Sequence, residues 1–358
     1  MDKDNPRVFS CYERTVSDTG FIGCFSEPIN IFLAISISHV IISLSENLFN
    51  LKVIYKSHLI LKLYYRNFYP DSLYLFFIRT GKEGFMVSSF YYDKGNFAPS
   101  QQDALVLEVA VLGRREAALL VVCDGIGGLR EGEYASSYVT MRLRSWFYEV
   151  YLRCRKRGYG WRRVQRDCIG ILYDCNQYLQ RYGAERGIRL GTTMTMVLLQ
   201  GRRFFSWAKA PLFVKYQLFH MGDSRAYHLG KWCQRLTEDD SCGDNMLCRC
   251  VGSFSWQDVQ KRQGHLWPGE RILLCSDGFW RRLEETELAE SLGNRERTWR
   301  NLRLSEEQMK KRLRKLGDAA RARGEKDNQA AVIVGMEGIV HSGKAYAADE
   351  RKQKRHVQ

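Results

Sequence analysis

Residues 121–128 read V-V-C-D-G-I-G-G, an apolar run that ends on Asp124 and is followed by three glycines in four residues. The apolar run predicts a buried strand. A carboxylate at the end of such a strand lies at the edge of the core, and a neighbouring glycine lets the backbone approach a ligand closely. A single Asp-Gly pair is commonly only a turn. The rest of the sequence must therefore decide between a turn and a site.

The same pattern recurs along the chain, because five aspartates stand at the ends of apolar strands. They are Asp103, Asp124, Asp223, Asp277 and Asp327. Five carboxylates at one edge of a fold would repel each other unless cations were bound among them. Oxygen ligands without His or Cys favour Mg²⁺ or Mn²⁺ over zinc. The set as a whole predicts a divalent-metal site.

Strand and helix patterns become orderly after Met86. Apolar runs and alternation predict strands at 105–111, 117–123, 193–199, 204–207, 216–221, 225–229, 271–275 and 330–334. Helical spacing of apolar residues predicts helices at about 131–157, 161–182, 284–292 and 303–323. Two groups of strands interleaved with helix pairs indicate stacked sheets with helices outside.

The composition excludes an intrinsically disordered chain and indicates a globular protein. With 45% hydrophobic and 27% charged residues the chain is globular, and its net charge of +15 attracts acidic or phosphate-rich partners. Eleven scattered cysteines, with no C-x-x-C pair, favour a reducing, cytoplasmic compartment. No recognised nucleic-acid-binding motif is present, so a nucleic-acid-binding reading rests on charge alone.

The two ends of the sequence differ from its middle. Residues 1–85 form a poorly specified N-terminal extension, which is either an artefact of the assigned start site, with translation beginning at Met86, or a real segment. The apolar stretch Ile29–Leu44 has sixteen residues, fewer than the roughly 20 that span a bilayer, so a membrane is not expected as a partner beyond a weak anchor. Residues 337–358 are expected to be a basic disordered tail.

Seven motifs in this order resemble those of the metal-dependent serine/threonine protein phosphatases of type 2C, in a spelling typical of bacterial members. They run from about Gly95 to Val334 and read Q-Q-D at 101–103, D-G-I-G-G at 124–128, G-T-T at 191–193, G-D-S-R-A-Y at 222–227, L-T-E-D-D-S at 236–241, C-S-D-G-F at 275–279 and K-D-N at 326–328. The resemblance implies an α+β fold, a four-layer α-β-β-α sandwich of two antiparallel sheets flanked by helix pairs. The phosphatase domain would span residues 86–336.

The resemblance also implies a catalytic centre with two Mn²⁺ or Mg²⁺ ions. Its catalytic residues would be Asp103, Asp124, Asp277 and Asp327. Asp124 would bridge the ions, the carbonyl of Gly125 would complete one coordination shell, and Asp277 and Asp327 would hold the other ion. Asp103 would act from the outer shell, with Ser276 and Asn328 as supports. A water activated between two such ions attacks phosphorus in line. The G-T-T motif is interpreted as structural.

Three positions depart from the family pattern. Ala98 stands where the family usually has a phosphate-binding arginine, so Lys94 or Arg281 replaces it or phosphate is bound less strongly. Ile126 stands where some members have a histidine that protonates the leaving group. Arg281 stands where some relatives have an aspartate of a third metal site, which leaves Asp223 as either a ligand of that ion or a turn residue.

The resemblance implies a phosphatase that hydrolyses phosphoserine and phosphothreonine in proteins. The expected partners are phosphorylated protein substrates and a cognate serine/threonine kinase, and a monomer is expected. The alternative is a pseudophosphatase, a regulator that keeps the fold and binds phosphoproteins without turnover. The missing arginine favours that alternative, whereas the retained Asp124, Asp277 and Asp327 oppose it, because buried carboxylates are costly to keep together without catalytic metals.

Overall fold

The computed structural model describes residues 85–336, apart from 96, 99, 113, 127–130, 155–159, 203–212, 243–245, 254 and 294–303. The extension predicted at 1–85, with its apolar stretch Ile29–Leu44, lies outside the described residues except for Phe85. The tail at 337–358 also lies outside them. Both terminal predictions therefore stay predictions.

The run that ends in Asp124 is a central strand, β3 (Arg115–Asp124), and it is covered on both faces. Successive side chains of a strand point to opposite faces. Leu119, Val121 and Cys123 accordingly pack under helices, whereas Leu120 and Val122 pack against the other sheet. This double burial explains why the sequence is apolar without interruption and not alternating.

Two five-stranded sheets, antiparallel throughout, form the middle of the domain. The first has the order β1-β12-β11-β6-β7, with bounds Met86–Asp93, Gln329–Met336, Arg271–Cys275, Arg225–Leu229 and Cys233–Arg235. The second has the order β10-β5-β4-β3-β2, with bounds Gln260–Leu266, Val214–Met221, Met194–Arg202, Arg115–Asp124 and Asp103–Leu112. A separate short hairpin pairs β8 (Ser241–Cys242) with β9 (Met246–Leu247).

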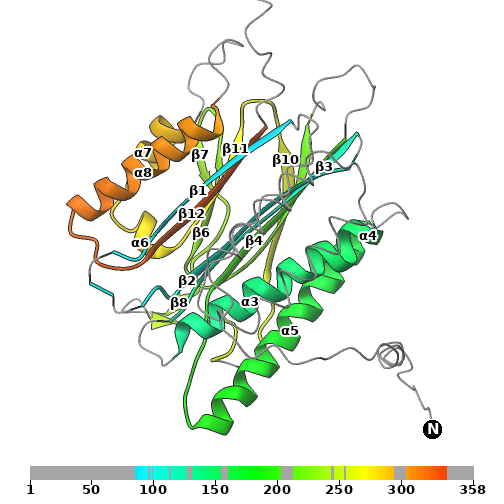
Figure 1. Ribbon diagram of the computed structural model, residues 1–358, viewed down its shortest axis with the longest axis vertical. Coiled ribbons are helices and arrows are strands. Elements are labelled where there is room, and N and C mark those ends of the chain that lie inside the picture. The colour runs from blue at the N-terminus through cyan, green and yellow to red at the C-terminus, as the bar shows by residue number, and fades with distance from the viewer. Residues whose placement is uncertain are drawn as a thin grey trace, which may run out of the picture. The chain divides into compact units, whose positions relative to one another are not determined.

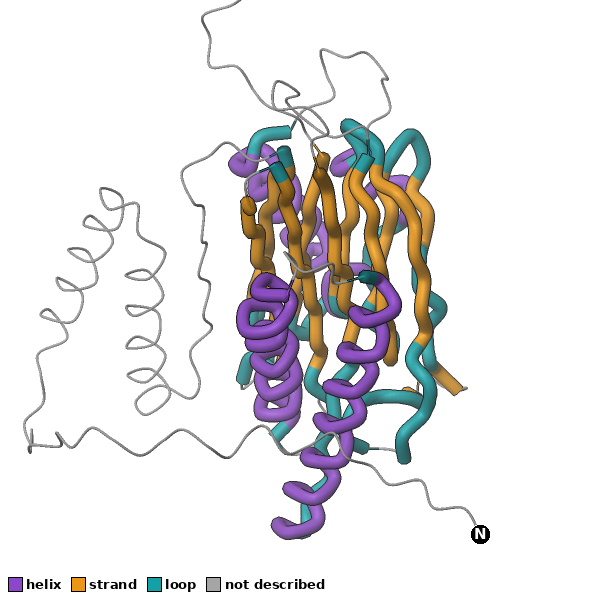
Figure 2. Tube along the Cα trace, turned by 90° about the vertical axis from the view of Figure 1, so that its right-hand side faces the viewer, coloured by secondary structure: helices purple, strands orange, loops and turns teal. Residues whose placement is uncertain are grey.

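Helices cover the outer face of each sheet (Figure 1). On the second sheet lie α3 (Gly132–Trp146), which continues through a π-helical turn η1 (Phe147–Tyr151) into α4 (Leu152–Cys154), and α5 (Trp161–Arg186). Figure 2 shows the two long helices side by side in front of the strands. On the first sheet lie α6 (Asp277–Trp280), α7 (Glu285–Leu292) and α8 (Glu306–Ala322).

Three apolar clusters hold these layers together: one between α3, α5 and the second sheet, one between the two sheets, and one under α7 and α8. The order of layers is therefore α-β-β-α, and the fold class expected from the motifs is confirmed. None of the helices in the described part of the chain combines the length and apolar character that crossing a bilayer requires.

Most predicted elements agree with the structure to within a few residues, and the differences have physical causes. Strands β1, β7, β8, β9 and β10 were not predicted. Strands β7, β8 and β9 are only two or three residues long, and the edge strand β10 reads Q-K-R-Q-G-H-L, which has little apolar pattern. The strand predicted at 204–207 lies outside the described residues. Seven cysteines in the described part are free thiols, but Cys248 is disulfide-bonded, which differs from the all-thiol state that a reducing compartment favours.

Candidate active site

Two of the predicted aspartates meet because β2 and β3 pair in register. Asp103, the first residue of β2, lies directly opposite Asp124, the last residue of β3. The Tyr92 hydroxyl donates to the Asp103 carbonyl oxygen at 2.8 Å, and the amide of Gly125 donates to the Gln102 carbonyl oxygen at 3.1 Å. The antiparallel register therefore fixes the first half of the candidate site.

Two threonines of the G-T-T motif hold the backbone of Asp124. The amide of Asp124 donates to the Thr193 hydroxyl at 2.9 Å, and its carbonyl oxygen accepts from the Thr193 amide and the Thr192 hydroxyl, each at 2.9 Å. The Thr193 hydroxyl also lies 2.8 Å from the Ser224 hydroxyl, next to Asp223. The structural interpretation of this motif agrees with these bonds, although the sequence did not reveal that it positions Asp124.

Gly125 has no room for a side chain. A Cβ atom built there would lie 2.4 Å from the carbonyl oxygen of Gly132 and 2.8 Å from that of Gln102. Only glycine lets the chain pass between these two backbone segments directly after Asp124. The glycine that follows the aspartate is thus a packing requirement of the site as well as the predicted source of a carbonyl ligand.

The first sheet supplies the second half of the site. Asp277 begins the short helix α6 directly after β11, and Ser276 is its N-cap. The Ser276 hydroxyl donates to Asp103 Oδ2 at 2.7 Å and accepts from the Ala330 amide at 2.9 Å. One buried serine therefore joins the two sheets at the aspartates.

Asp327 lies in the loop before β12, and the neighbouring Asn328 anchors that loop. Asn328 Oδ1 accepts from the Gln102 amide at 2.8 Å, and its Nδ2 donates to the Lys94 carbonyl oxygen at 2.9 Å. The Asp327 side chain is 52% exposed. Asn328 thus ties the loop of Asp327 to the segment just before Asp103, while Asp327 itself stays open to solvent.

The carboxylates of the two halves influence each other electrostatically. Burial, followed by the nearby Asp103, Asp223 and Asp327, raises the pKa of Asp124 well above its ordinary value. Burial also raises the pKa of Asp103 to about 7, although the Ser276 hydroxyl opposes this shift. Burial raises the pKa of Asp223 in the same direction. These anions are close enough together to be costly without a cation.

Arg281 lies inside this group of acids. Its guanidinium pairs with Asp277 Oδ2, and its Nη1 lies 4.0 Å from Asp327 Oδ2. Its charge also opposes the rise in the pKa of Asp223. The sequence identified Arg281 as a departure from the family, but the pairing with two predicted metal ligands was not predicted.

The donor set suits a hard divalent cation, although it is not pre-arranged around one. In the described part of the chain no group of three or more His, Cys, Asp or Glu side chains is arranged to hold a metal ion. However, Asp277 Oδ1 is buried without a hydrogen-bond partner among the described residues. A buried carboxylate oxygen without a partner needs a ligand to offset its lost hydration. The residues therefore fit a metal that completes the site on binding.

The remaining departures have clear positions. Ala98 lies in the β1–β2 loop with Lys94, which is exposed. The amide of Ile126 donates to the Gly191 carbonyl oxygen at 3.1 Å, so this residue is held by backbone. Asp223 lies in the β5–β6 turn, where its carbonyl oxygen accepts from Trp280 Nε1 at 3.2 Å.

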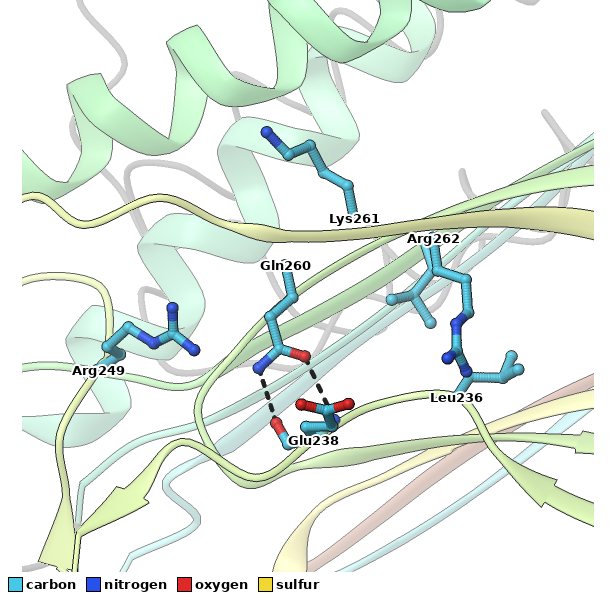
Figure 3. A pocket seen from close by; sticks show the side chains of 7 residues that line it. Leu236, Glu238, Arg249, Gln260, Lys261 and Arg262 are labelled. Carbon is cyan, nitrogen blue, oxygen red and sulfur yellow. Dashed lines mark hydrogen bonds between the residues drawn. The ribbon is translucent and has the colours of Figure 1, made fainter.

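A separate pocket of about 320 Å³ lies beside β10, the edge strand of the second sheet opposite β2 (Figure 3). Gln260 bonds there to the backbone of Glu238 through both ends of its amide, at 3.3 and 2.8 Å. Its cations Arg249 and Lys261 pair with Asp240 and Asp258. The pocket contains none of the predicted catalytic residues, so it is not the candidate active site.

Comparison with known proteins identifies the fold. No protein-family model and no curated protein matches the chain. Among solved structures, it resembles PppA, described as a key regulatory component of T6SS in Pseudomonas aeruginosa, with 22% identity and a TM-score of 0.54 over 72% of this chain and 99% of that one.

Two further solved structures agree with this match. A bacterial serine phosphatase gives 22% identity and a TM-score of 0.55 over 71% of this chain and 99% of that one. The S. agalactiae serine/threonine phosphatase gives 19% identity and a TM-score of 0.55 over 70% of this chain and 100% of that one. The chain therefore has the fold of the bacterial serine/threonine phosphatases, as its motifs led us to expect.

Proposed function

We propose that the chain is a metal-dependent protein phosphatase that hydrolyses phosphoserine and phosphothreonine. The observation that carries the proposal is that the strand register and Ser276 bring Asp103 and Asp124 to the start of α6. There Asp277 Oδ1 is buried without a hydrogen-bond partner among the described residues, and Arg281 contacts both Asp277 and Asp327. Burial, followed by neighbouring carboxylates, raises the pKa of Asp103 and Asp124, and such a cluster costs stability unless a cation binds to it.

Asp124, the carbonyl of Gly125, Asp277 and Asp327 would hold two Mn²⁺ or Mg²⁺ ions. Bound there, the ions supply an activated water and positive charge for the transferring phosphoryl group. The protein's own residues do the positioning: Thr193 and Thr192 fix Asp124, Ser276 fixes the Asp103 carboxyl, and Asn328 fixes the Asp327 loop.

The proposed substrates are phosphorylated proteins, to which the net charge of +15 is attractive, and the proposed partner is the serine/threonine kinase that phosphorylates them. We also propose a cytoplasmic monomer. Nothing in the described residues requires nucleic acid or a membrane for this chemistry.

The test is hydrolysis of a phosphoserine peptide and of p-nitrophenyl phosphate by the full chain. We expect activity with Mn²⁺, none with EDTA, and a loss with Asp277→Asn at an unchanged circular dichroism spectrum. Activity that persists in EDTA, or that survives Asp277→Asn, would contradict the proposed centre.

A second candidate is a phosphoprotein-binding regulator without turnover. The observation that favours it is Arg281, whose guanidinium lies between two of the proposed ligands. A chain that binds a phosphopeptide but hydrolyses neither substrate at any Mn²⁺ concentration would support this second candidate over the first.

A further inference from the structure

Arg281 holds a position in which its charge balances the acids of the proposed metal site. Its guanidinium pairs with Asp277 Oδ2 and lies 4.0 Å from Asp327 Oδ2. Among the described residues, the ion pairs of these two aspartates come from Arg281 alone. A guanidinium keeps its charge at any working pH and presents several donors to carboxylates.

The backbone places Arg281 there, because it follows Asp277 by four residues, about one helical turn. The Arg281 amide donates to the Asp277 carbonyl oxygen at 2.8 Å, which closes α6. The preceding residue, Trp280, is held by its bond to Asp223 and by the guanidinium of Arg225, which lies 3.2 Å from the ring centre. The start of the Arg281 side chain is therefore fixed beside the acids.

The outer part of the same side chain has room to leave. The Arg281 side chain is 43% exposed, whereas that of Asp277 is 10% exposed. An arginine at a surface can rotate into solvent and keep its charge hydrated, at the cost of one partly screened ion pair. The Asp277 carboxylate has less freedom, since it is buried at the first residue of α6, directly after β11.

We infer that Arg281 is an internal counter-ion, which partly neutralises Asp277 and Asp327 in the metal-free protein and must be displaced when a divalent cation binds. The inference rests on the metal site of the proposed function. A positive charge beside the ligands disfavours a second cation, so Arg281 lowers the affinity for divalent metal while it stabilises the metal-free fold. The chain would thus take up metal only when the cation concentration is high enough to outcompete its own guanidinium.

The experiment is isothermal titration of Mn²⁺ into the full, EDTA-stripped chain and into Arg281→Gln. We expect Arg281→Gln to bind Mn²⁺ more tightly by about tenfold, because the competing charge is gone. The matched control is Arg282→Gln, the adjacent residue, whose Nε lies 3.7 Å from Glu325 and which has no described ion pair with the cluster. The control should bind Mn²⁺ as the wild type does.

Thermal unfolding in EDTA provides a second measurement. Arg281→Gln should unfold at a lower temperature than the wild type, because Asp277 loses its partner, and Arg281→Lys should restore part of the difference. Saturating Mn²⁺ should remove or invert the difference between the wild type and Arg281→Gln. This crossover would not arise from a merely structural arginine, which would stabilise both states.

Each outcome bears on the inference. Equal or weaker Mn²⁺ binding by Arg281→Gln overturns it, and so does the absence of Mn²⁺ binding by both forms. If Arg281→Gln binds more tightly and yet neither form hydrolyses phosphate esters, the counter-ion role stands and the proposed phosphatase activity fails. If hydrolysis needs Mn²⁺ but the affinity for Mn²⁺ is the same in the wild type and Arg281→Gln, the proposed phosphatase activity stands and the counter-ion role fails.

Discussion

The two halves of the candidate site hold their acids in different ways. In the half built by β2 and β3, Asp103 and Asp124 lie opposite each other, and burial raises the pKa of both. In the half built by α6 and the loop before β12, Asp277 and Asp327 lie next to the guanidinium of Arg281. One pair reduces its charge by favouring protonation, and the other is balanced by a resident cation.

The difference shows how one fold tolerates dense negative charge at an edge shared by two sheets. Burial raises the pKa of the acids in the first half and so favours their protonation, whereas the second half depends on Arg281, a side chain that differs from the family pattern. Ser276 connects the halves, because it follows β11 of the first sheet and donates to Asp103 of the second. Substitutions in each half, and at the connection, should therefore have different consequences.

The largest effect is expected for Asp124→Asn, in the first half. Under the proposed function, loss of the bridging carboxylate should lower kcat by about a thousandfold, the scale seen when one preorganised stabilising group is removed from an active site. The metal-free protein should not lose stability, because the variant removes one of two facing buried acids. Phosphopeptide hydrolysis and urea unfolding in EDTA measure these two effects.

The two measurements can separate the explanations. If Asp124→Asn strongly destabilises the metal-free chain, the carboxylate has a structural role that the register pair does not explain. The comparison variant is Asp258→Asn, whose carboxylate is 78% exposed beside the separate pocket and should change neither measurement.

The next largest effect is expected for Ser276→Ala, which removes the connection between the halves. The substitution leaves Asp103 Oδ2 and the Ala330 amide without the bonds of 2.7 and 2.9 Å that the hydroxyl makes. Buried groups left without a partner cost about 2 kcal/mol of unfolding free energy. Urea denaturation at pH 7 measures the loss.

A matched substitution tests whether burial of the bonds matters. Ser305→Ala removes a serine hydroxyl that accepts the Gln308 amide at 3.2 Å on the exposed start of α8. Its cost should be about 1 kcal/mol, the typical value of a helix N-cap. If Ser276→Ala costs no more than this, the two sheets are not coupled through Ser276.

Elements with a strong apolar pattern could be predicted because the pattern lies within the element's own sequence and does not depend on its partners. The run before Asp124 is covered on both faces, so its character is visible without knowledge of its partners. Strand β10 was missed because, as an edge strand, it carries polar side chains that the local pattern does not distinguish from a loop. The four-layer order was also accessible, because the motifs resemble those of a known family.

The site was predicted as residues, but not as contacts. The positions of Asp103, Asp124, Asp277 and Asp327 followed from strand ends and motifs. Their arrangement depends on the register of β2 with β3 and on a serine that bonds across 173 positions, neither of which leaves a local signal. The same reason hid the pairing of Arg281 with Asp277, since a helical spacing of four residues predicts proximity and not the direction of a side chain.

The smallest effect is expected at an arginine–carboxylate pair outside the cluster, which serves as a reference for Arg281. Arg323 lies 2.5 and 2.7 Å from the two oxygens of Glu287, and its guanidinium lowers the pKa of that acid to about 2. Both side chains are substantially exposed, so water and salt screen the pair. Glu287→Gln should therefore lower Tm by only roughly 2 °C at pH 7 and low salt.

The sign of its pH dependence follows from the lowered pKa. The acid titrates near 4.5 when unfolded and near 2 when folded, so its contribution is present above about pH 4.5 and is lost as the pH falls towards 2. The glutamine keeps an acceptor for the Glu284 amide, which Glu287 now binds at 2.9 Å, so the comparison isolates the charge. Thermal unfolding of both forms at pH 7 and pH 3 should show a Tm difference that narrows at the lower pH. If Glu287→Gln lowers Tm at pH 7 as much as Arg281→Gln does in EDTA, Arg281 contributes no more than an ordinary surface ion pair. That result would contradict its role as counter-ion of the acid cluster.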